Sequence, residues 1–245
     1  MVSRLPLLAS QHLLSSVNTR INLYHAERIP HDKPFIVVSN HRSFMDPMLL
    51  MVSLNQSIRF ACHQYMAQVP FLKDLVRHMG GFALEATDNH PRNRHQALFD
   101  DASHFLSNGE VVGLFPEGAQ PMVHHTQPDA LGAFHRGFAH LLLRSPLPTV
   151  TLLPMAIASR DESNYSGLPV RFLSWFDPSE PLFDHSGLHP LVVYHQVNVM
   201  IGHPVTIAAN DKAAYKGRKG VLLSRNLTQH CHEEIRSLLT RGLSL

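Results

Sequence analysis

The sequence predicts an α/β fold: a mixed, largely parallel sheet flanked by helices, with an amphipathic helix at the N-terminus. Short β-branched segments alternate with helical ones from residue 35 to about 157, which is typical of parallel strands joined by helices. Later strands follow one another without clear helices between them, which favours antiparallel additions. The chain has 245 residues, 44% of them apolar, enough for one large domain with a sizeable core.

The expected elements follow from local patterns. Residues 35–39 (FIVVS) form a β-branched run after a turn and indicate a buried strand. Residues 47–54 indicate a helix, with Asp46 as its N-cap and Pro47 at its first position. Further strands are expected at residues 58–62, 82–86, 110–115, 150–157, 170–176 and 194–201. Further helices are expected at residues 70–79, 91–107, 131–144 and 217–241.

We expect two regions, an N-terminal helical segment at residues 1–28 and a main domain at residues 29–245. Apolar residues in the first region are spaced for one helical stripe: Leu5, Leu7, Leu8, Leu13, Leu14 and Val17. The helix either packs on its own domain or lies in the plane of a membrane surface. No apolar run is long enough for a signal-peptide core or a transmembrane helix.

Composition excludes several classes of function. The net charge of +2 is too small to indicate nucleic-acid binding. Only 16% of residues are charged, which fits an apolar groove or a membrane-facing side. The two cysteines, Cys62 and Cys231, define no disulfide framework, and the neighbouring histidine pairs complete no zinc spacing. Neither a dinucleotide-binding glycine motif nor a P-loop occurs, so no nucleotide cofactor is expected. Because no zinc spacing is complete, no metal is expected either.

The strongest chemical signal lies in the segment NHRSFMDP at residues 40–47, between an expected strand and an expected helix. Ligands of open α/β sheets bind beyond the carboxyl ends of the strands. His41 and Asp46 would diverge on a continuous helix, but they can meet in a loop that turns into one. Such a pair can remove a proton from a hydroxyl, with imidazole as the base and the carboxylate orienting it. Alternatively, Asp46 only caps the helix and His41 is an ordinary loop residue.

Other blocks extend this signal over roughly residues 30–160. They are GGFAL at residues 80–84, GLFPEG at 113–118, FHRG at 134–137 and LPM at 153–155. In order and spacing the blocks resemble the glycerolipid acyltransferase superfamily, which includes glycerol-3-phosphate and lysophosphatidic acid acyltransferases. The resemblance implies transfer of a fatty acyl group from acyl-CoA or acyl-carrier protein to a hydroxyl acceptor in lipid biosynthesis.

The resemblance also implies the site residues. His41 would be the general base and Asp46 its orienting partner. Glu117 would bind the acceptor or organise the site, unless it serves its turn only structurally. The expected substrate-binding residues are Asn40, Arg42, Ser43, Phe115, Pro116, Glu117, Gly118, Arg92 and Arg136. We expect the active site in a crevice formed by the loops at residues 40–46, 80–94 and 116–124. Met45, Met48 and Leu49 either line an acyl groove or belong to the core.

Two positions depart from the pattern of the phosphate-accepting enzymes. Ala86 and Gln120 stand where those enzymes usually carry arginine. Arginine binds phosphate through a charged fork of donors, whereas alanine offers no donor and glutamine no charge. Other cationic side chains could replace the arginines: Arg92, Arg94, Arg136, His124 and His125. The predicted acceptor is therefore another lipid, a sugar, a polyol or an amine-bearing hydroxyl compound.

Two other functions stay open. A thioesterase or lipid hydrolase would use water in place of the acceptor, although no Gly-x-Ser-x-Gly elbow is present. A catalytically idle lipid-binding protein could keep the fold, but intact His41, Asp46 and Glu117 argue against it. The expected partners are acyl-CoA or acyl-carrier protein, a lipid or other hydroxyl acceptor, and a membrane surface. We expect a cytoplasmic protein that is peripheral on the membrane.

Overall fold

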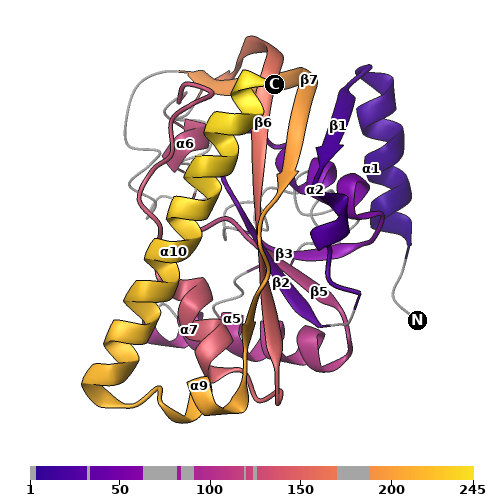
Figure 1. Ribbon diagram of the computed structural model, residues 1–245. Helices are drawn as coiled ribbons and strands as arrows, with labels where there is room; N and C mark the ends of the chain where they lie inside the picture. The colour runs from indigo at the N-terminus through magenta and orange to yellow at the C-terminus, as the bar shows by residue number, and fades with distance from the viewer. Residues whose placement is uncertain are drawn as a thin grey trace.

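The computed structural model describes residues 4–31, 34–62, 82–83, 91–118, 120–123, 126–169 and 188–245 (Figure 1). Its strands are β1 (Arg20–Tyr24), β2 (Phe35–Ser39), β3 (Ile58–Cys62), β4 (Phe82–Ala83), β5 (Val111–Leu114), β6 (Val150–Pro169), β7 (Leu188–Ile201) and β8 (Val205–Ile207). Its helices are α1 (Leu5–Ser16), the 3-10 helix η1 (Ala26–Arg28), α2 (Asp46–Leu54), α5 (Pro91–Ser107), α6 (Gln120–Val123), α7 (Gly137–Arg144), α9 (Ala209–Ala213) and α10 (Gly217–Ser244).

The described strands form one mixed sheet in the order β1-β7-β6-β2-β5-β3-β4, with β8 also on β6. β2 lies between β5 and β6 and is parallel to both. The later strands β7 and β8 are antiparallel to β6. The predicted α/β class is therefore confirmed, and the end of β2 at Ser39 delivers the 40–46 loop to the middle of the sheet.

Two hydrophobic layers cover the sheet, and β2 supplies side chains to both. Phe35 and Val37 belong to a cluster with α1 and α2, whereas Ile36 and Val38 belong to a cluster with α5, α7 and α10. This two-residue alternation is the pattern of a strand buried on both faces. Figure 1 shows the long α10 crossing one side of the sheet, with α1 and α2 on the other.

Several expected elements differ in extent. The expected helix at 131–144 begins only at Gly137, because the backbone N–H groups of Gly132 and His135 are bonded to Glu117 and Pro116. The strand expected at 150–157 runs on to Pro169, because β7 pairs with it along its length. The sequence pattern did not predict β1, β8, η1, α6 or α9, and β1 lies within the N-terminal segment expected to be helical, residues 1–28. The expected elements at 70–79 and 170–176, and residues 84–86, lie outside the described residues.

The N-terminal helix is present, but its apolar residues do not form one buried stripe. Leu7 and Leu14 are buried in the core cluster that α2 shares. The remaining members are exposed on α1 or directly after it: Leu5, Leu8, Leu13 and Val17. The helix thus packs on its own domain with one side and presents leucines to solvent with another.

Candidate active site

The structure brings His41 and Asp46 together. His41 Nδ1 lies 2.9 Å from Asp46 Oδ2, and the side chains are 15% and 1% exposed. In this geometry the Nδ1–H of a neutral His41 ring donates to the Asp46 carboxylate. The other ring nitrogen, Nε2, then carries the free lone pair. This is the arrangement in which an imidazole can accept a proton from a hydroxyl.

Asp46 serves the loop rather than the helix. The expected N-cap role is wrong, because α2 begins at Asp46 itself and its N-cap is Met45. Asp46 Oδ2 also accepts the backbone N–H groups of Arg42 at 2.7 Å and Ser43 at 2.8 Å. Its other oxygen, Oδ1, accepts the hydroxyl of Tyr194 at 3.0 Å. The carboxylate therefore closes the 40–46 loop around itself and holds the imidazole in the same contact.

An aromatic stack fixes the plane of the His41 ring. The ring lies 4.0 Å from that of Phe115 at an interplanar angle of 13°, and Phe115 in turn stacks on Phe60 at 5.2 Å. Gly113 makes room for this stack, since a Cβ there would lie 2.2 Å from the Phe60 ring. Phe115 thus contacts the candidate base directly.

Glu117 links two loops through backbone contacts. It is 4% exposed, and its two oxygens accept the N–H of His41 at 3.1 Å and of Gly132 at 2.6 Å. Burial raises the pKa of the Glu117 carboxyl above its ordinary value of 4.5, against the lowering effect of these two donors. A Cβ at residue 132 would lie only 3.0 Å from Oε2, so glycine permits this close approach. Glu117 therefore links the backbone of His41 to the loop that carries Gly132.

The turn that carries Glu117 requires its glycine. Gly118 has a φ of +69° and donates its N–H to the Phe115 carbonyl, while Pro116 is buried and its carbonyl accepts the His135 N–H. A Cβ at Gly118 would meet no atom closer than 4.0 Å. The left-handed backbone, rather than lack of space, favours glycine there.

Asn40 and Ser43 tie the loop to the sheet. The Asn40 amide donates to the Ile157 carbonyl at 3.0 Å and accepts the Ile157 N–H at 2.8 Å, so its side chain continues the ladder between β2 and β6. Ser43 donates its hydroxyl to the Val192 carbonyl on β7 at 2.7 Å. Both side chains are buried. Their described contacts position the loop.

Arg42 is engaged in a buried ion pair. Its guanidinium donates to both carboxylate oxygens of Glu162 at 2.9 Å and to the Thr126 carbonyl, and the Arg42 side chain is 3% exposed. Burial lowers the pKa of Arg42, but the Glu162 hydrogen bond and the electrostatic interactions with neighbouring acidic groups together outweigh it, so the net change is a rise. Burial likewise raises the pKa of Glu162, but the hydrogen bonds that it accepts, chiefly from Arg42, and the Arg42 charge together outweigh this effect and lower the pKa. Both shifts keep the pair charged.

The two remaining expected substrate-binding residues, Arg92 and Arg136, lie in a helix or at its start. Arg136 is exposed at the N-cap of α7, and Gln120 is exposed at the start of α6. Arg92 and Arg94 lie in α5, but their side chains are outside the described part, as are Ala86, Ala119, His124 and His125. The three residues proposed for an acyl groove belong to the core, where each is at most 4% exposed: Met45, Met48 and Leu49.

Sequence reasoning missed two side chains that hold the site, Glu162 and Tyr194. They lie 120 residues from Arg42 and 148 residues from Asp46, respectively. Neither belongs to a motif block. Tyr194 is the first residue of an expected strand, whereas Glu162 lies beyond the strand expected at 150–157. A buried carboxylate and a buried arginine in one loop do indicate that partners are needed, but the sequence does not show where those partners lie.

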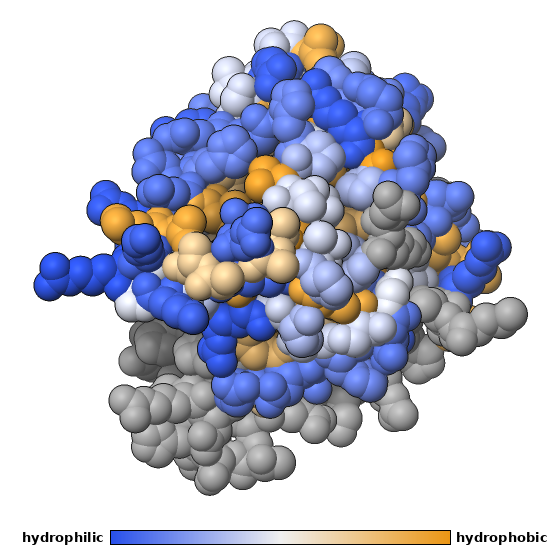
Figure 2. All heavy atoms as spheres, turned by 60° about the horizontal axis from the view of Figure 1, so that its bottom comes forward, coloured by the Kyte–Doolittle hydropathy of each residue, from blue (hydrophilic) through white to orange (hydrophobic). Residues whose placement is uncertain are grey.

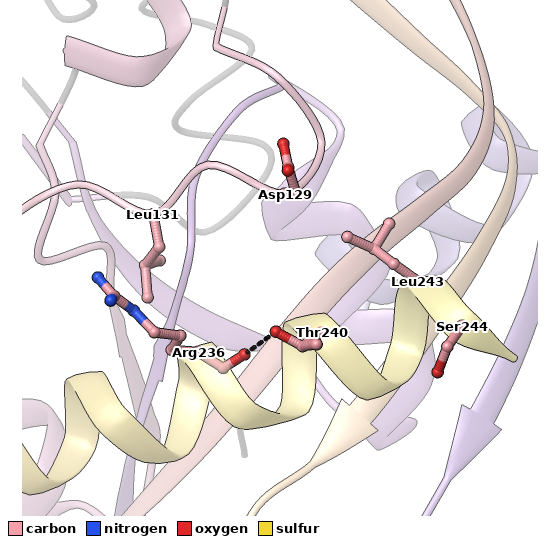
Figure 3. A pocket seen from close by; sticks show the side chains of 6 residues that line it. All are labelled: Asp129, Leu131, Arg236, Thr240, Leu243 and Ser244. Atoms are coloured by element: carbon pink, nitrogen blue, oxygen red, sulfur yellow. Dashed lines mark hydrogen bonds between the residues drawn. The ribbon is translucent and has the colours of Figure 1, made fainter.

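A hollow of about 620 Å³ lies on the α10 side of the loop at residues 126–136 (Figure 3). Its lining residues are Asp129, Leu131, Arg236, Thr240, Leu243 and Ser244. The Leu131 side chain extends toward α10, where Arg236 lies (Figure 3). The same loop contacts Arg42 through Thr126 and Glu117 through Gly132. This loop therefore connects the hollow to the His41 site, whose residues do not line it.

Comparison with known proteins identifies the family of the chain. A family model described as "Acyltransferase" matches residues 20–158, more than half of the chain. The chloroplastic 1-acyl-sn-glycerol-3-phosphate acyltransferase LPAT1 of Arabidopsis thaliana is 30% identical over 119 residues, 48% of this chain and 31% of that protein. The corresponding BAT2 protein of Brassica napus is 28% identical over 124 residues, 51% of this chain and 33% of that one. This chain thus spans about a third of these relatives' length.

A solved structure shares the fold. The crystal structure of the 1-acyl-sn-glycerophosphate acyltransferase PlsC from Thermotoga maritima superimposes with a TM-score of 0.59 at 16% identity, covering 96% of this chain and 77% of that one. The fold, the matched family model and the motif blocks agree. The chain therefore belongs to the acyltransferase family, within the glycerolipid acyltransferase superfamily.

Proposed function

We propose that this protein transfers a fatty acyl group from acyl-CoA or acyl-carrier protein to a hydroxyl acceptor, with His41 as general base and Asp46 as its partner. The observation that carries the proposal is the 2.9 Å contact between His41 Nδ1 and a carboxylate that is 1% exposed. A buried carboxylate holds the tautomer and stabilises the imidazolium that forms.

The proposed step needs no covalent intermediate on the protein. Nε2 of His41 takes the proton of the acceptor hydroxyl as its oxygen bonds to the thioester carbonyl carbon. The carbon–sulfur bond then breaks, and the thiolate leaves with the proton that His41 returns. An ester and a free thiol result, so each proton and electron pair is accounted for. Glu117 supports the step by holding the His41 backbone.

The acceptor is proposed to differ from lysophosphatidic acid. The relatives are named for 1-acyl-sn-glycerol 3-phosphate as acceptor. This chain carries Ala86 and Gln120 where arginines are expected in phosphate-accepting members. A neutral residue in each place removes the charged donors that bind a phosphate monoester. A hydroxyl acceptor without a phosphate monoester fits these residues better.

Mass spectrometry of the products tests this function. The protein is incubated with acyl-CoA or acyl-carrier protein and, in parallel, with lysophosphatidic acid, glycerol 3-phosphate, a neutral lysolipid and a polyol. We expect an acylated product with an acceptor that lacks a phosphate monoester. Robust acylation of lysophosphatidic acid would overturn the acceptor proposal and leave acyl transfer standing. Free fatty acid alone would indicate a hydrolase, and no product from any donor would indicate a lipid-binding protein.

We also propose that the protein binds a membrane surface peripherally through α1. Leu5, Leu8 and Leu13 are 56%, 50% and 42% exposed, whereas Leu7 and Leu14 anchor the helix to the core. Exposed leucines on one helix face support insertion into the headgroup region of a bilayer. No helix in the described ranges is long and apolar enough to cross a membrane.

Vesicle flotation tests the α1 proposal. Replacing Leu5, Leu8 and Leu13 by Ser should reduce the fraction that floats with phospholipid vesicles several-fold, because each leucine contributes apolar area to insertion. Val221→Ser/Leu222→Ser is the matched control, since these residues are 56% and 55% exposed. They lie in the first turns of α10, at the bottom of Figure 1. Figure 2 turns this end of the molecule forward and shows apolar side chains interspersed with hydrophilic ones. Equal flotation of the triple variant and the unmodified protein would exclude α1 as the contact.

A further inference from the structure

Two residues that face each other across β6 and β7 bind the two charged residues of the 40–46 loop, Arg42 and Asp46. Glu162 on β6 and Tyr194 on β7 are register partners in the antiparallel pair. Directly opposite residues in such a pair place their side chains on the same face of the sheet. Glu162 binds the guanidinium of Arg42, and the Tyr194 hydroxyl binds the carboxylate of Asp46. The β6–β7 pair therefore holds the loop on either side of its central residues.

β7 makes further contacts with the same loop beside Tyr194. The backbone N–H of Tyr194 points at the sulfur of Met45 at 3.4 Å, and the Ser43 hydroxyl donates to the Val192 carbonyl. The Tyr194 carbonyl accepts the Thr19 hydroxyl at 2.8 Å, which fixes the strand from its other side. Tyr194 is thus held by backbone contacts while its phenol reaches Asp46.

The Tyr194 hydroxyl satisfies the Asp46 oxygen that faces away from His41. Oδ2 accepts His41 and two backbone N–H groups, whereas Oδ1 accepts Tyr194 among the described residues. Tyr194 is 1% exposed and Asp46 is fully buried, so this contact is shielded from solvent. Burial and the Asp46 charge raise the pKa of the phenol, which keeps its proton on the hydroxyl as a donor. Without the Tyr194 donor, a buried carboxylate oxygen of Asp46 would lose its hydrogen bond, which costs free energy. The carboxylate would also lose a contact that fixes its orientation.

We infer that Tyr194 is a positioning residue for acyl transfer, which fixes the Asp46 carboxylate so that Oδ2 stays on His41 Nδ1. This inference rests on the proposed function of the His41–Asp46 pair and extends it to β7. Glu162 supports the same loop through Arg42, so one cross-strand pair sets the loop geometry. The residue acts through Asp46 and does not itself touch the reacting atoms.

Kinetics of Tyr194→Phe test the inference, with thiol release from the acyl donor as the readout. Phenylalanine keeps the ring and removes the hydroxyl. We expect kcat to fall roughly 10-fold, the size of one lost hydrogen bond to a charged group. KM for the acyl donor should change less than about 2-fold, because Tyr194 is 1% exposed and so offers almost no surface to a bound donor. Tyr165→Phe is the matched control on β6, since Tyr165 is 54% exposed and should retain full activity.

A second background separates positioning from a general structural effect. In an Asp46→Ala protein, Tyr194→Phe should cause no further loss of the residual rate, because the group it orients is absent. An equal loss in both backgrounds would overturn the inference, as would an unchanged kcat in the single variant.

Nitrogen-15 NMR of histidine-labelled protein gives a readout that needs no turnover. The His41 ring signals are assigned by their loss in His41→Ala. We expect the neutral ring to be held as the Nδ1–H tautomer, and Tyr194→Phe to shift its nitrogen resonances toward a mixture of tautomers. Unchanged His41 resonances would overturn the inference. If no acyl transfer is found, the proposed function fails, and this spectrum still decides the role of Tyr194.

Discussion

Replacing His41 by Ala is expected to lower kcat for acyl transfer by about 10³-fold. A positioned general base contributes about 10²–10⁴-fold to such a step. Alanine removes Nε2, and the acceptor hydroxyl then has no base at the site. The rate of acylated product formation by mass spectrometry measures the loss, with the acceptor found in the product panel.

The variant should keep its fold. The backbone N–H of His41 remains available to Glu117, and the Asp46 carboxylate keeps the N–H groups of Arg42 and Ser43. His203→Ala is a matched control, since His203 Nδ1 also lies 2.9 Å from a carboxylate, that of Glu234, but the His203 side chain is 65% exposed. This control should retain full activity. A His41→Ala protein with more than a tenth of the normal rate would contradict the mechanism.

Replacing Arg42 by Met is expected to lower the free energy of unfolding by about 3–5 kcal/mol. Removing one partner of a buried ion pair leaves the other charge uncompensated. The change leaves the Glu162 carboxylate, which is 11% exposed, without its cationic partner. It also removes two donors from the Thr126 carbonyl. Urea unfolding, with midpoint and slope compared, measures the effect.

Arg59→Met is the control for this ion pair. Arg59 lies 2.6 Å from Glu110 but is 31% exposed, so solvent screens the interaction. Such pairs contribute about 0–1 kcal/mol. A loss for Arg42→Met no larger than that of the control would show that the loop does not depend on its buried pair.

The stability difference between the Arg42→Met variant and the unmodified protein should also depend on pH. Arg42 holds the pKa of Glu162 below its ordinary value of 4.5, so the pair's contribution is present above that value. It is lost as the pH falls through the folded-state pKa of Glu162. Glu117 has a raised pKa and the opposite sign, but both proteins carry it and its effect cancels in the difference.

Local patterns were sufficient for much of the fold. The β-branched run at 35–39 became β2, and the polar helix at 91–107 became α5 at the same bounds. Both depend on neighbours within a few residues, through a run of apolar β-branched side chains or through helix-forming propensity. The helix expected at 131–144 lost its first turns because Glu117 and Pro116 compete for its backbone N–H groups. That competition comes from another part of the chain.

By itself, the sequence determined the α/β class, the family blocks and the short loop in which His41 and Asp46 can meet. Each of these features depends on the spacing of residues within one segment, and the geometry of helices and strands links that spacing directly to local structure. Only the tertiary structure decided that Arg42 pairs with Glu162 and that Tyr194 completes the Asp46 carboxylate. The partners come from strands 120 and 148 residues away, and sheet topology and register, rather than any local pattern, place them beside the loop.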